Sequence, residues 1–513
     1  MSEEKLPEGW AEASLGDLID GFQSGRSLSG EGRPAGIREI GVLKISAVTW
    51  GEFDPSENKT LPAGTVPRDY ERIRRGDLLI SRANTAELVG AVVRVKDDHP
   101  NLMLPDKLLR IVLQTNIDPD FVKFALRTPA ARAHLEDNAT GTSQSMRNLS
   151  QPKMAATPLW LPPLAEQRRI VEKVEALLAQ ANAARARLAK LPTILKRFRQ
   201  SILSAACSGR LTEAWKQGRK LESIEEVLRR VRFDQSHTGR AATEDSIVGQ
   251  VLAVGDPQLP APDGWKWVSL TEVARLESGH TPSRKHPEYW DGDIAWIGIL
   301  DAGEHHGGRI SKTRQTITPK GIENSAARLL PKNTVCLSRT ASVGYVVIMD
   351  REMATSQDFV DWVCSEAIVP EFLMYALMAE GEGIKKFGRG TTHTTIYFPE
   401  VKALHICLPP VEEQKQIVRL AAHGLQLADA IEARVAAATA RADKITQAIL
   451  AKAFRGELVP TEAELARKEA RDYEPATALL ARIRAQRAAS EATPKPATRT
   501  PRRRATAVGK RKW

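Results

Sequence analysis

The sequence predicts an α+β fold: two tandem mixed α/β domains separated by two long antiparallel coiled-coil helices, with a pseudo-two-fold internal repeat. The first observation behind this prediction is a 45-residue stretch that occurs twice without a gap, at 161–205 and at 408–452. The second is that the segments before the two copies, 1–160 and 261–407, also resemble each other. A repeat of this length sets the architecture before any single element is assigned.

Each copy of the repeat is predicted to be a long helix. Leu-Pro-Pro opens both copies, and proline suits the first turn of a helix, where its missing amide hydrogen would have no partner anyway. Apolar residues follow at alternating spacings of four and three, which indicates a coiled-coil seam. One seam is rich in Leu and the other in Ala and Gly, so large residues can pack on small ones. Pro192 is expected to bend the first helix without ending it; the alternative to a helix pair is two unrelated amphipathic helices, each packed on its own domain.

Inside the two domains, short apolar runs between polar turns predict matching strands and helices. The strands include two hairpins, and the short helices each begin near a proline. Each domain is then an α+β unit of about 150 residues, which is a usual domain size. The predicted hairpins are 77–81 with 89–95 and 334–338 with 345–349; the other strands are 42–48, 108–113, 293–299 and 358–364; the helices are 118–127 and 370–378.

These patterns divide the chain into seven consecutive segments. Two domains and two spacer helices alternate, and each spacer helix is followed by a charged segment with a helical pattern. The last residues are rich in Pro, Thr, Ala and Arg, a composition typical of disorder. The segments are a first domain at 1–160, a spacer helix at 161–210, a charged helical segment and linker at 211–260, a second domain at 261–407, a second spacer helix at 408–458, a charged helix at 459–491 and a disordered basic tail at 492–513.

Composition indicates a soluble globular protein of the cytoplasm. Hydrophobic residues make up 42% of the chain and charged residues 27%. No run of 18 apolar residues occurs, so no membrane contact is expected. The four cysteines lie far apart without a Cys-x-x-Cys spacing, which favours reduced thiols. The first residues do not resemble a signal peptide.

The net charge is weak evidence about the folded domains. It is +11 for the whole chain, which invites a nucleic-acid interpretation. However, residues 492–513 contain eight Lys or Arg and no acid, so only +3 remains for the rest of the chain. The tail can touch DNA phosphates without sequence preference, or it can be a solvated segment with no specific partner.

The sequence contains no recognisable catalytic motif. There is no Gly-x-x-x-x-Gly-Lys-Ser/Thr loop for a nucleoside triphosphate and no Gly-rich loop typical of a methyl-donor site. His305-His306 lies in a Gly-rich stretch and is interpreted as a surface turn. We therefore expect a non-catalytic chain with no cofactor and no metal.

Polar loops at matching positions of the two domains are the candidate DNA contacts. Arg pairs with guanine edges, Asn and Gln with adenine, and hydroxyl groups with bases or phosphates. The alternative is that these are ordinary solvated loops. The candidate residues are Arg26, Ser27, Arg82, Asn84, Thr85, Ser143, Gln144, Ser145 and Arg147 in the first domain, and Thr281, Ser283, Arg284, Lys285, Arg339, Ser342, Arg389, Thr391, Thr392, His393 and Thr394 in the second.

The chain resembles the specificity (S) subunit of type I restriction–modification enzymes over about residues 6–460. The resemblance rests on the paired Gly-Trp starts, the two Leu-Pro-Pro helices that each carry Glu-Gln, and the fragments at 104–110, 287–290 and 354–359. It implies two target recognition domains that each read one half of a split, asymmetric site in double-stranded DNA. It also implies that the helices bind two methyltransferase (modification) subunits, through which restriction subunits join. Those partners would methylate adenine or cleave DNA with ATP.

The physical arrangement agrees with this resemblance. Two domains on a rigid spacer suit two half-sites about one helical turn apart. The pseudo-two-fold repeat would let two copies of one partner dock equivalently. Two alternatives remain: a coiled-coil scaffold without a role on DNA, and a stand-alone DNA-modifying enzyme, which would need a methyl-donor or metal site.

Overall fold

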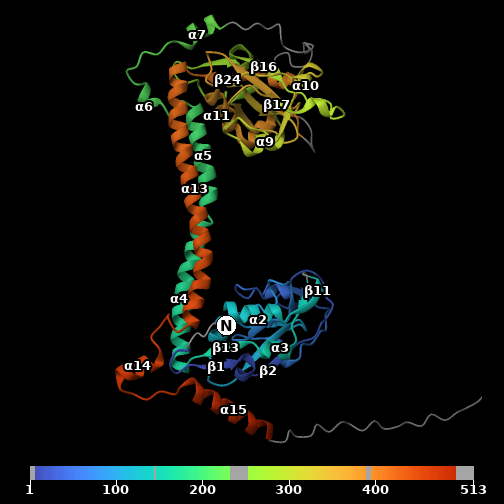
Figure 1. Cartoon of the computed structure of the whole chain (residues 1–513), viewed down its shortest axis with the longest axis vertical. Helices are drawn as coiled ribbons and strands as arrows, with labels where there is room; N and C mark the ends of the chain where they lie inside the picture. The colour runs from blue at the N-terminus through green and yellow to red at the C-terminus, as the bar shows by residue number, and fades with distance from the viewer. Residues whose placement is uncertain (1–5, 144–145, 232–251, 389–393, 493–513) are drawn as a thin grey trace, which may run out of the picture. The chain divides into compact units, whose positions relative to one another are not determined.

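The computed structural model describes residues 6–143, 146–231, 252–388 and 394–492, and the chain forms two compact units. Unit 1 consists of residues 1–188 and 438–513, and unit 2 consists of residues 189–437. Each unit contains a mixed α/β domain and a stretch of paired helices (Figure 1). The predicted α+β class is therefore confirmed. Except for Ala492, the predicted basic tail lies outside the described residues.

The first copy of the repeat forms two helices and the second forms one. They are α4 (Leu164–Leu188), α5 (Leu191–Cys207) and α13 (Val411–Phe454). The prediction that Pro192 bends a continuous helix was wrong, because α4 ends and α5 begins just before this proline. Proline has no amide hydrogen for the carbonyl oxygen of Leu188, and its ring crowds that carbonyl.

In unit 2, α5 packs on the first half of α13 with opposed chain direction. Arg199 is paired with Asp429 at 2.6 Å, and Ile202 lies against Gly424. A Cβ atom on Gly424 would come within 2.8 Å of the Ile202 side chain. The predicted packing of large residues on small ones is confirmed at this crossing.

In unit 1, α4 packs on the last part of α13. Arg185 donates to the carbonyl oxygen of Ala442 at 2.8 Å and is paired with Asp443 at 3.1 Å. Not every predicted seam position is covered, since Phe198 of unit 2 is 38% exposed and Ile445 of unit 1 is 45% exposed. Two helices alone bury only a narrow stripe, so large side chains at its margin remain in solvent.

The Glu-Gln pair of the repeat joins helix and domain in unit 1. The buried Glu166 carboxylate accepts hydrogen bonds from Nε1 of Trp10 and the amide of Glu462, both at 2.8 Å. Burial raises the pKa of Glu166 despite these bonds. Gln167 donates to the carbonyl oxygen of Pro162 at 3.0 Å and accepts from the amide of Asp118 at 3.1 Å.

The second Glu-Gln pair, Glu413 and Gln414, joins helix and domain in unit 2 in the same way. Glu413 accepts from the hydroxyl of Thr212 at 2.8 Å. Gln414 accepts from the amide of Val369 at 2.7 Å and donates to the carbonyl oxygen of Ala367 at 2.8 Å. The repeated motif therefore satisfies buried backbone groups where the helix meets the domain, which unpaired would be costly.

The described residues of unit 1 form four sheets in its domain. Their strand orders are β1-β13, β2-β10-β6-β8, β11-β12-β7 and β4-β3-β9-β5. β6 and β8 form the predicted antiparallel hairpin, but the strand predicted at 42–48 stops after three residues and continues as a helical turn. The strands are β1 (Ala11–Ser14), β2 (Ile19–Ser24), β3 (Gly41–Leu43), β4 (Asn58–Thr60), β5 (Arg72–Ile73), β6 (Leu78–Ser81), β7 (Ala83–Asn84), β8 (Val92–Arg94), β9 (His99–Met103), β10 (Leu108–Leu113), β11 (Thr140–Ser143), β12 (Met146–Asn148) and β13 (Pro158–Leu161).

Three sheets form the domain of unit 2 within the part of the chain that the structure describes. Their strand orders are β14-β24-β15, β16-β23-β20-β21-β18 and β19-β17-β22. β20 and β21 form the second predicted hairpin. The strands are β14 (Leu252–Val254), β15 (Lys266–Ser269), β16 (Ala274–Ser278), β17 (Trp290–Ile297), β18 (Arg309–Ile310), β19 (Gln315–Ile317), β20 (Val335–Ser338), β21 (Val346–Met349), β22 (Ala354–Thr355), β23 (Phe359–Cys364) and β24 (Leu404–Leu408).

Short helices complete the two domains. In unit 1 they are η1 (Leu15–Leu18), η2 (Ile45–Ala47), η3 (Asp69–Glu71), α1 (Pro119–Ala125), α2 (Pro129–Asp137) and α3 (Gln151–Ala155). In unit 2 they are α8 (Leu270–Val273), η5 (Pro287–Tyr289), α9 (Ile299–Glu304), α10 (Pro319–Glu323), α11 (Pro370–Glu380), η6 (Gly381–Phe387) and α12 (Phe398–Lys402). None of the helices in the described ranges is both long and apolar enough to cross a membrane.

The charged segments that follow α5 and α13 cover the domains. α6 (Glu213–Lys216) and α7 (Ile224–Arg230) follow α5, and Ile224 joins the core of unit 2. α14 (Glu462–Glu469) and α15 (Ala476–Ala492) follow α13, and Leu479, Leu480 and Ile483 join the core of unit 1. In each unit, the segment that follows a long helix therefore packs on the domain and adds residues to its core.

Candidate nucleic-acid interface

In unit 1 three loops leave the same end of one sheet. β2 ends at Ser24 and β6 ends at Ser81, and β10 lies between them with opposite direction. At the start of β10, Leu108 is paired with Ser81 and Leu109 with Ser24. The chain that follows β2, the chain that follows β6 and the chain that precedes β10 therefore meet.

Backbone hydrogen bonds tie these loops together. The amide of Gly25 donates to the carbonyl oxygen of Pro105 at 3.0 Å. Arg82 donates its amide to the carbonyl oxygen of Lys107 at 3.0 Å and accepts from the amide of Leu149 at 2.8 Å. The pairing of β12 with β7 brings in a fourth loop. We call this surface edge 1 and define it as residues 24–29, 82–87, 104–107, 141–143 and 146–149.

Unit 2 contains the same frame. β16 and β20 end on either side of the start of β23. The amide of His280 donates to the carbonyl oxygen of Thr355 at 2.9 Å. Arg339 donates to that of Asp358 at 2.7 Å and accepts from the amide of Ile396 at 2.9 Å. We call this surface edge 2 and define it as residues 278–285, 339–342, 355–358, 388 and 394–396.

A glycine at the same place in each edge allows two backbone segments to touch. A Cβ atom on Gly25 would lie 1.6 Å from the carbonyl oxygen of Leu104. One on Gly279 would lie 2.1 Å from that of Ser356. Any other residue would therefore separate the first loop from the strand beside it, which explains why both loops begin Ser-Gly.

Arg26 of edge 1 is bound to a buried carboxylate. Its Nε lies 2.6 Å from Oε1 of Glu71 and its Nη2 lies 2.8 Å from Oε2, and the Glu71 side chain is fully buried. Burial acts to raise the pKa of Glu71, but the hydrogen bonds from Arg26 and from the amide of Arg68 outweigh it, so the pKa lies below its usual value. This pair anchors the first loop to η3.

Arg82 occupies the centre of edge 1. It is half-buried, and its guanidinium has no hydrogen bond or ion pair with any residue that the structure describes. Nδ2 of Asn84 donates to Oγ of Ser81 at 3.4 Å, and its Oδ1 accepts from the amide of Thr85 at 2.9 Å. Asn84 therefore has a preset orientation, whereas Arg82 is available to a ligand.

The other candidates of edge 1 have varied surroundings. Ser27 is exposed. Arg147 is paired across the sheet with Asn84, and its Nη2 donates to the carbonyl oxygen of Glu136 at 3.5 Å. Gln144 and Ser145 lie outside the described residues, and the side chain of Ser143 is not described.

Arg339 of edge 2 is more restrained than Arg82. Its Nη2 donates to the carbonyl oxygen of Gln357 at 3.1 Å, and its guanidinium carbon lies 5.0 Å from the centre of the Phe398 ring. Burial lowers the pKa of this guanidinium, while the nearby Asp358 acts against that shift. Its Nε is buried without a hydrogen-bond partner among the described atoms.

The first loop of edge 2 carries an arginine on an aromatic ring. The guanidinium carbon of Arg284 lies 4.3 Å from the centre of the Trp290 ring, and its Nη2 donates to Oε1 of Gln315 at 2.9 Å. Thr281 donates to Oε1 of Gln357. Of the remaining candidates, Ser283 and Lys285 are exposed and Ser342 and Thr394 are half-buried, whereas Arg389, Thr391, Thr392 and His393 lie outside the described residues.

Sequence reasoning missed two residues that the fold brings to these edges. Lys107 of edge 1 and Gln357 of edge 2 lie just before β10 and β23, beside Arg82 and Arg339. Both fall in short fragments that support the family resemblance, at 104–110 and 354–359. The sequence therefore marked the two fragments, but only the sheet order places Lys107 and Gln357 beside the other loops.

The described ranges contain no group of three or more His, Cys, Asp or Glu side chains that could hold a metal ion. The four cysteines are free thiols.

Comparison with known proteins agrees with the fold and the paired edges. Residues 262–424 match the family model described as type I restriction modification DNA specificity domain. The EcoBI specificity subunit of Escherichia coli is 30% identical over 365 residues, which cover 69% of this chain and 69% of that protein. The EcoKI specificity subunit of Escherichia coli strain K12 is 25% identical over 514 residues, which cover 96% and 98%.

Solved structures share the fold. The HsdS subunit from Thermoanaerobacter tengcongensis matches with a TM-score of 0.54 at 22% identity, over 89% of this chain and 99% of that one. A chain from a study of complex assembly and conformational transition of the type I R-M system matches with a TM-score of 0.59 at 21% identity, over 88% and 99%. With the family model and the relatives, the paired domains identify this chain: it belongs to the specificity subunits of type I restriction enzymes.

Proposed function

We propose that this chain reads a split, asymmetric DNA site, with edge 1 on one half and edge 2 on the other. The observation that carries the proposal is that both edges have the same backbone frame and different side chains. Two half-sites of duplex DNA have the same backbone and different bases. Two surfaces with a shared backbone frame and different side chains suit such a ligand. DNA recognition itself follows from membership of the specificity subunits.

Within the edges, we assign base contact first to the arginines. The guanidinium of Arg82 is free to bind O6 and N7 of guanine, and Arg339 and Gln357 lie together on edge 2. Lys107 suits a phosphate. Arg26 is held by Glu71, so its part is to position the first loop.

The domain and partner assignments extend the same proposal. Residues 1–160 and 261–407 are the two target recognition domains, and 161–210 with 408–458 form the spacer. The matching Glu-Gln junctions support equivalent docking of two methyltransferase subunits, which restriction subunits would join. The chain itself is non-catalytic and acts in the cytoplasm, and its partners methylate adenine or cleave.

The test is a genome-wide map of methylated adenine in the host, with and without this gene. Loss of one split, asymmetric motif on deletion is the expected result, and restoration by the intact gene is the control. Complementation with Arg82→Ala should alter recognition in one half of the motif, and Arg339→Ala in the other half. A methylation map that does not change on deletion, in a host that expresses the chain, would contradict the proposal.

A further inference from the structure

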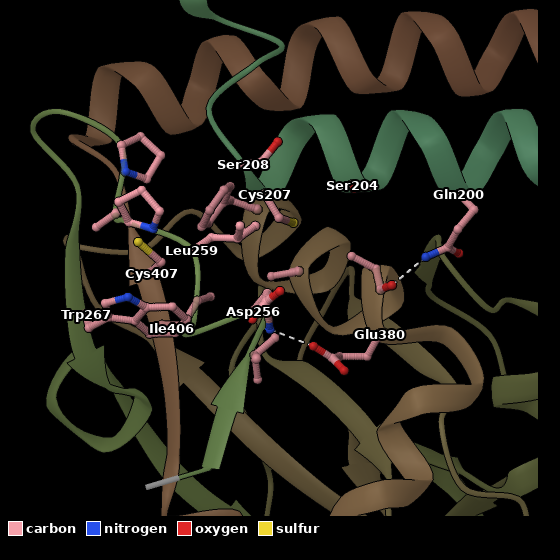
Figure 2. A pocket seen from close by; sticks show the side chains of 18 of the residues that line it. Gln200, Ser204, Cys207, Ser208, Asp256, Leu259, Trp267, Glu380, Ile406 and Cys407 are labelled. Atoms are coloured by element: carbon pink, nitrogen blue, oxygen red, sulfur yellow. Dashed lines mark hydrogen bonds between the residues drawn. The ribbon is translucent and has the colours of Figure 1, made fainter.

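Unit 2 holds a pocket of about 440 Å³ between its spacer helix and its domain. Figure 2 shows its walls: the end of α5 with Ser204 and Cys207, the strand β24 with Ile406 and Cys407, and α11. The segment 254–262 forms another wall. That segment continues from β14, which is paired in parallel with β24.

β14 and the segment after it are anchored at this pocket. Val254 is paired with Ile406, and the amide of Gly255 donates to Oε1 of Glu380 at 2.6 Å (Figure 2). Glu380 in turn is paired with Lys386 at 2.7 Å. The edge strand and the chain after it thus complete one side of the domain.

Unit 1 holds the counterpart of this pocket, with a volume of about 330 Å³. Ala451 and Phe454 of α13 stand where Ser204 and Cys207 stand in unit 2. The same offset of 247 residues relates Leu159 and Trp160 of β13 to Ile406 and Cys407. The pocket lining is mainly apolar.

The two pockets differ in one element. In unit 2 the central strand β24 has partners on both edges, β15 and β14. In the described part of unit 1, β13 is paired with β1 alone, and no strand lies where β14 lies. An unpaired edge beside an apolar pocket is suited to an added strand.

A stretch that shares Ala-Val-Gly with β14 and the residue after it occurs at the corresponding place in the chain. β14 and the next residues read Leu-Ala-Val-Gly-Asp at 252–256, and residues 506–510 read Thr-Ala-Val-Gly-Lys. The first follows α6 and α7, and the second follows α14 and α15. The 13 residues at 493–505 can span roughly 45 Å when extended, and a domain of this size is roughly 40 Å across.

We propose that residues 506–510 add to β13 as a parallel edge strand, and that the residues after them place Trp513 in the apolar pocket of unit 1. This assigns the last residues to the folding of unit 1 and replaces the expectation of a wholly disordered basic tail. It does not depend on which bases edge 1 reads.

The existing hydrogen bonds define the pairing. The amide of Leu15 donates to the carbonyl oxygen of Thr157 at 2.9 Å, so Thr157 and alternate residues after it face β1. Pro158 and Trp160 then face the open edge. Pro158 has no amide hydrogen, so it offers only its carbonyl oxygen, which would accept from the amide of Val508. The amide of Trp160 would donate to the carbonyl oxygen of Val508.

The test is hydrogen exchange of the Trp160 amide in the full chain, together with any partner subunits that co-purify. We expect exchange to be at least about tenfold faster after removal of residues 505–513 and in Val508→Pro. Ala507→Pro is the matched control, because the amide of Ala507 would point away from β13. It should leave the protection of Trp160 unchanged. Trp513→Ala should raise exchange around Phe454 without changing edge 1.

Equal exchange of the Trp160 amide in the full chain and in the truncated chain would overturn the proposal. Equal effects of Val508→Pro and Ala507→Pro would also overturn it, because the strand would then not have the stated register. A loss of DNA affinity on truncation with unchanged exchange would assign the tail to DNA phosphates instead, and the proposed strand would be rejected. The methylation motif tests the proposed function separately.

Discussion

Edge 1 and edge 2 have one backbone frame but differ in how firmly their side chains are held. Arg82 has no side-chain partner among the described residues, whereas Arg339 donates to Gln357 and lies over the Phe398 ring. In the first loops, Arg26 is bound to the buried Glu71, and Arg284 lies on Trp290. Backbone bonds therefore define where the loops meet, while side-chain surroundings decide which residue is free to contact a base.

The largest effect is expected from breaking the frame of one edge. Gly25→Val would force the first loop away from Leu104, because a Cβ atom has no room there. Loss of two or more contacts of about 1–3 kcal/mol each would lower DNA affinity by roughly 30-fold or more. Gly279→Val should have the same effect through edge 2.

Gly32→Val is the control, because a Cβ atom on Gly32 meets no atom within 4 Å. Binding to DNA that carries the mapped site, measured by titration, gives the affinities of all three variants. If Gly25→Val binds like the parent, the close approach of the two segments has no role in recognition.

The second effect separates the two arginines. Arg82→Ala should lower specific affinity by about 1–3 kcal/mol and leave the thermal unfolding midpoint unchanged, because no described side chain loses a partner. Arg339→Ala should lower affinity by a similar amount and also lower the midpoint, since its contacts with Gln357 and Phe398 are lost. Parallel titrations and thermal scans measure both quantities; a lower midpoint in Arg82→Ala alone would reverse the comparison.

The third effect is a pH dependence of the pair that anchors the first loop of edge 1. The pKa of Glu71 lies below its usual value in the folded chain, so its contribution to stability is present above the unfolded-state pKa of about 4.3 and is lost as pH falls through the folded value. Glu71→Gln should therefore flatten the decline in stability of unit 1 below about pH 5.

Hydrogen exchange within η3 at several pH values follows this local stability. Glu12→Gln, at an exposed carboxylate of the same unit, is the control. An identical decline in the parent and in Glu71→Gln would show that the pair with Arg26 does not stabilise the loop.

The smallest effect concerns the residues that sequence reasoning missed. Lys107→Ala should weaken binding to all sequences alike and reduce the slope of log affinity against log salt by about 1, as expected for one phosphate contact. Asp358 occupies the corresponding position of edge 2, so Asp358→Ala should leave that slope unchanged or raise affinity slightly. Titrations at several salt concentrations measure it, and a change in preferred sequence with Lys107→Ala would instead assign this residue to a base.

Local sequence patterns predicted most of the fold. The alternating spacing of apolar residues predicted the helix pair, and the two hairpins were placed correctly because each joins strands close in sequence. The strand at 42–48 was too long, and the helix through Pro192 was predicted as continuous. The first error lies where the chain turns into η2, and the second where a proline lacks the amide hydrogen that a continuous helix needs.

The candidate residues were chosen by chemistry, and the fold brought several of them together. Arg82 and Arg147 lie in strands or loops joined by β7 and β12, although they are far apart in the sequence. No local pattern shows that Arg26 meets Glu71, since that bond depends on how η3 packs beside β2. Lys107 and Gln357 were overlooked for the same reason.

The sequence by itself determined the repeat, the long paired helices, the hairpins and the family resemblance, because each depends on spacing and composition along the chain. Only the tertiary structure decided which loops form the two edges, which arginine is anchored and which is free, and which strand of unit 1 has an open edge. These features depend on contacts between distant residues, and the free energy of such contacts depends on sheet order and burial, which no single stretch of sequence specifies.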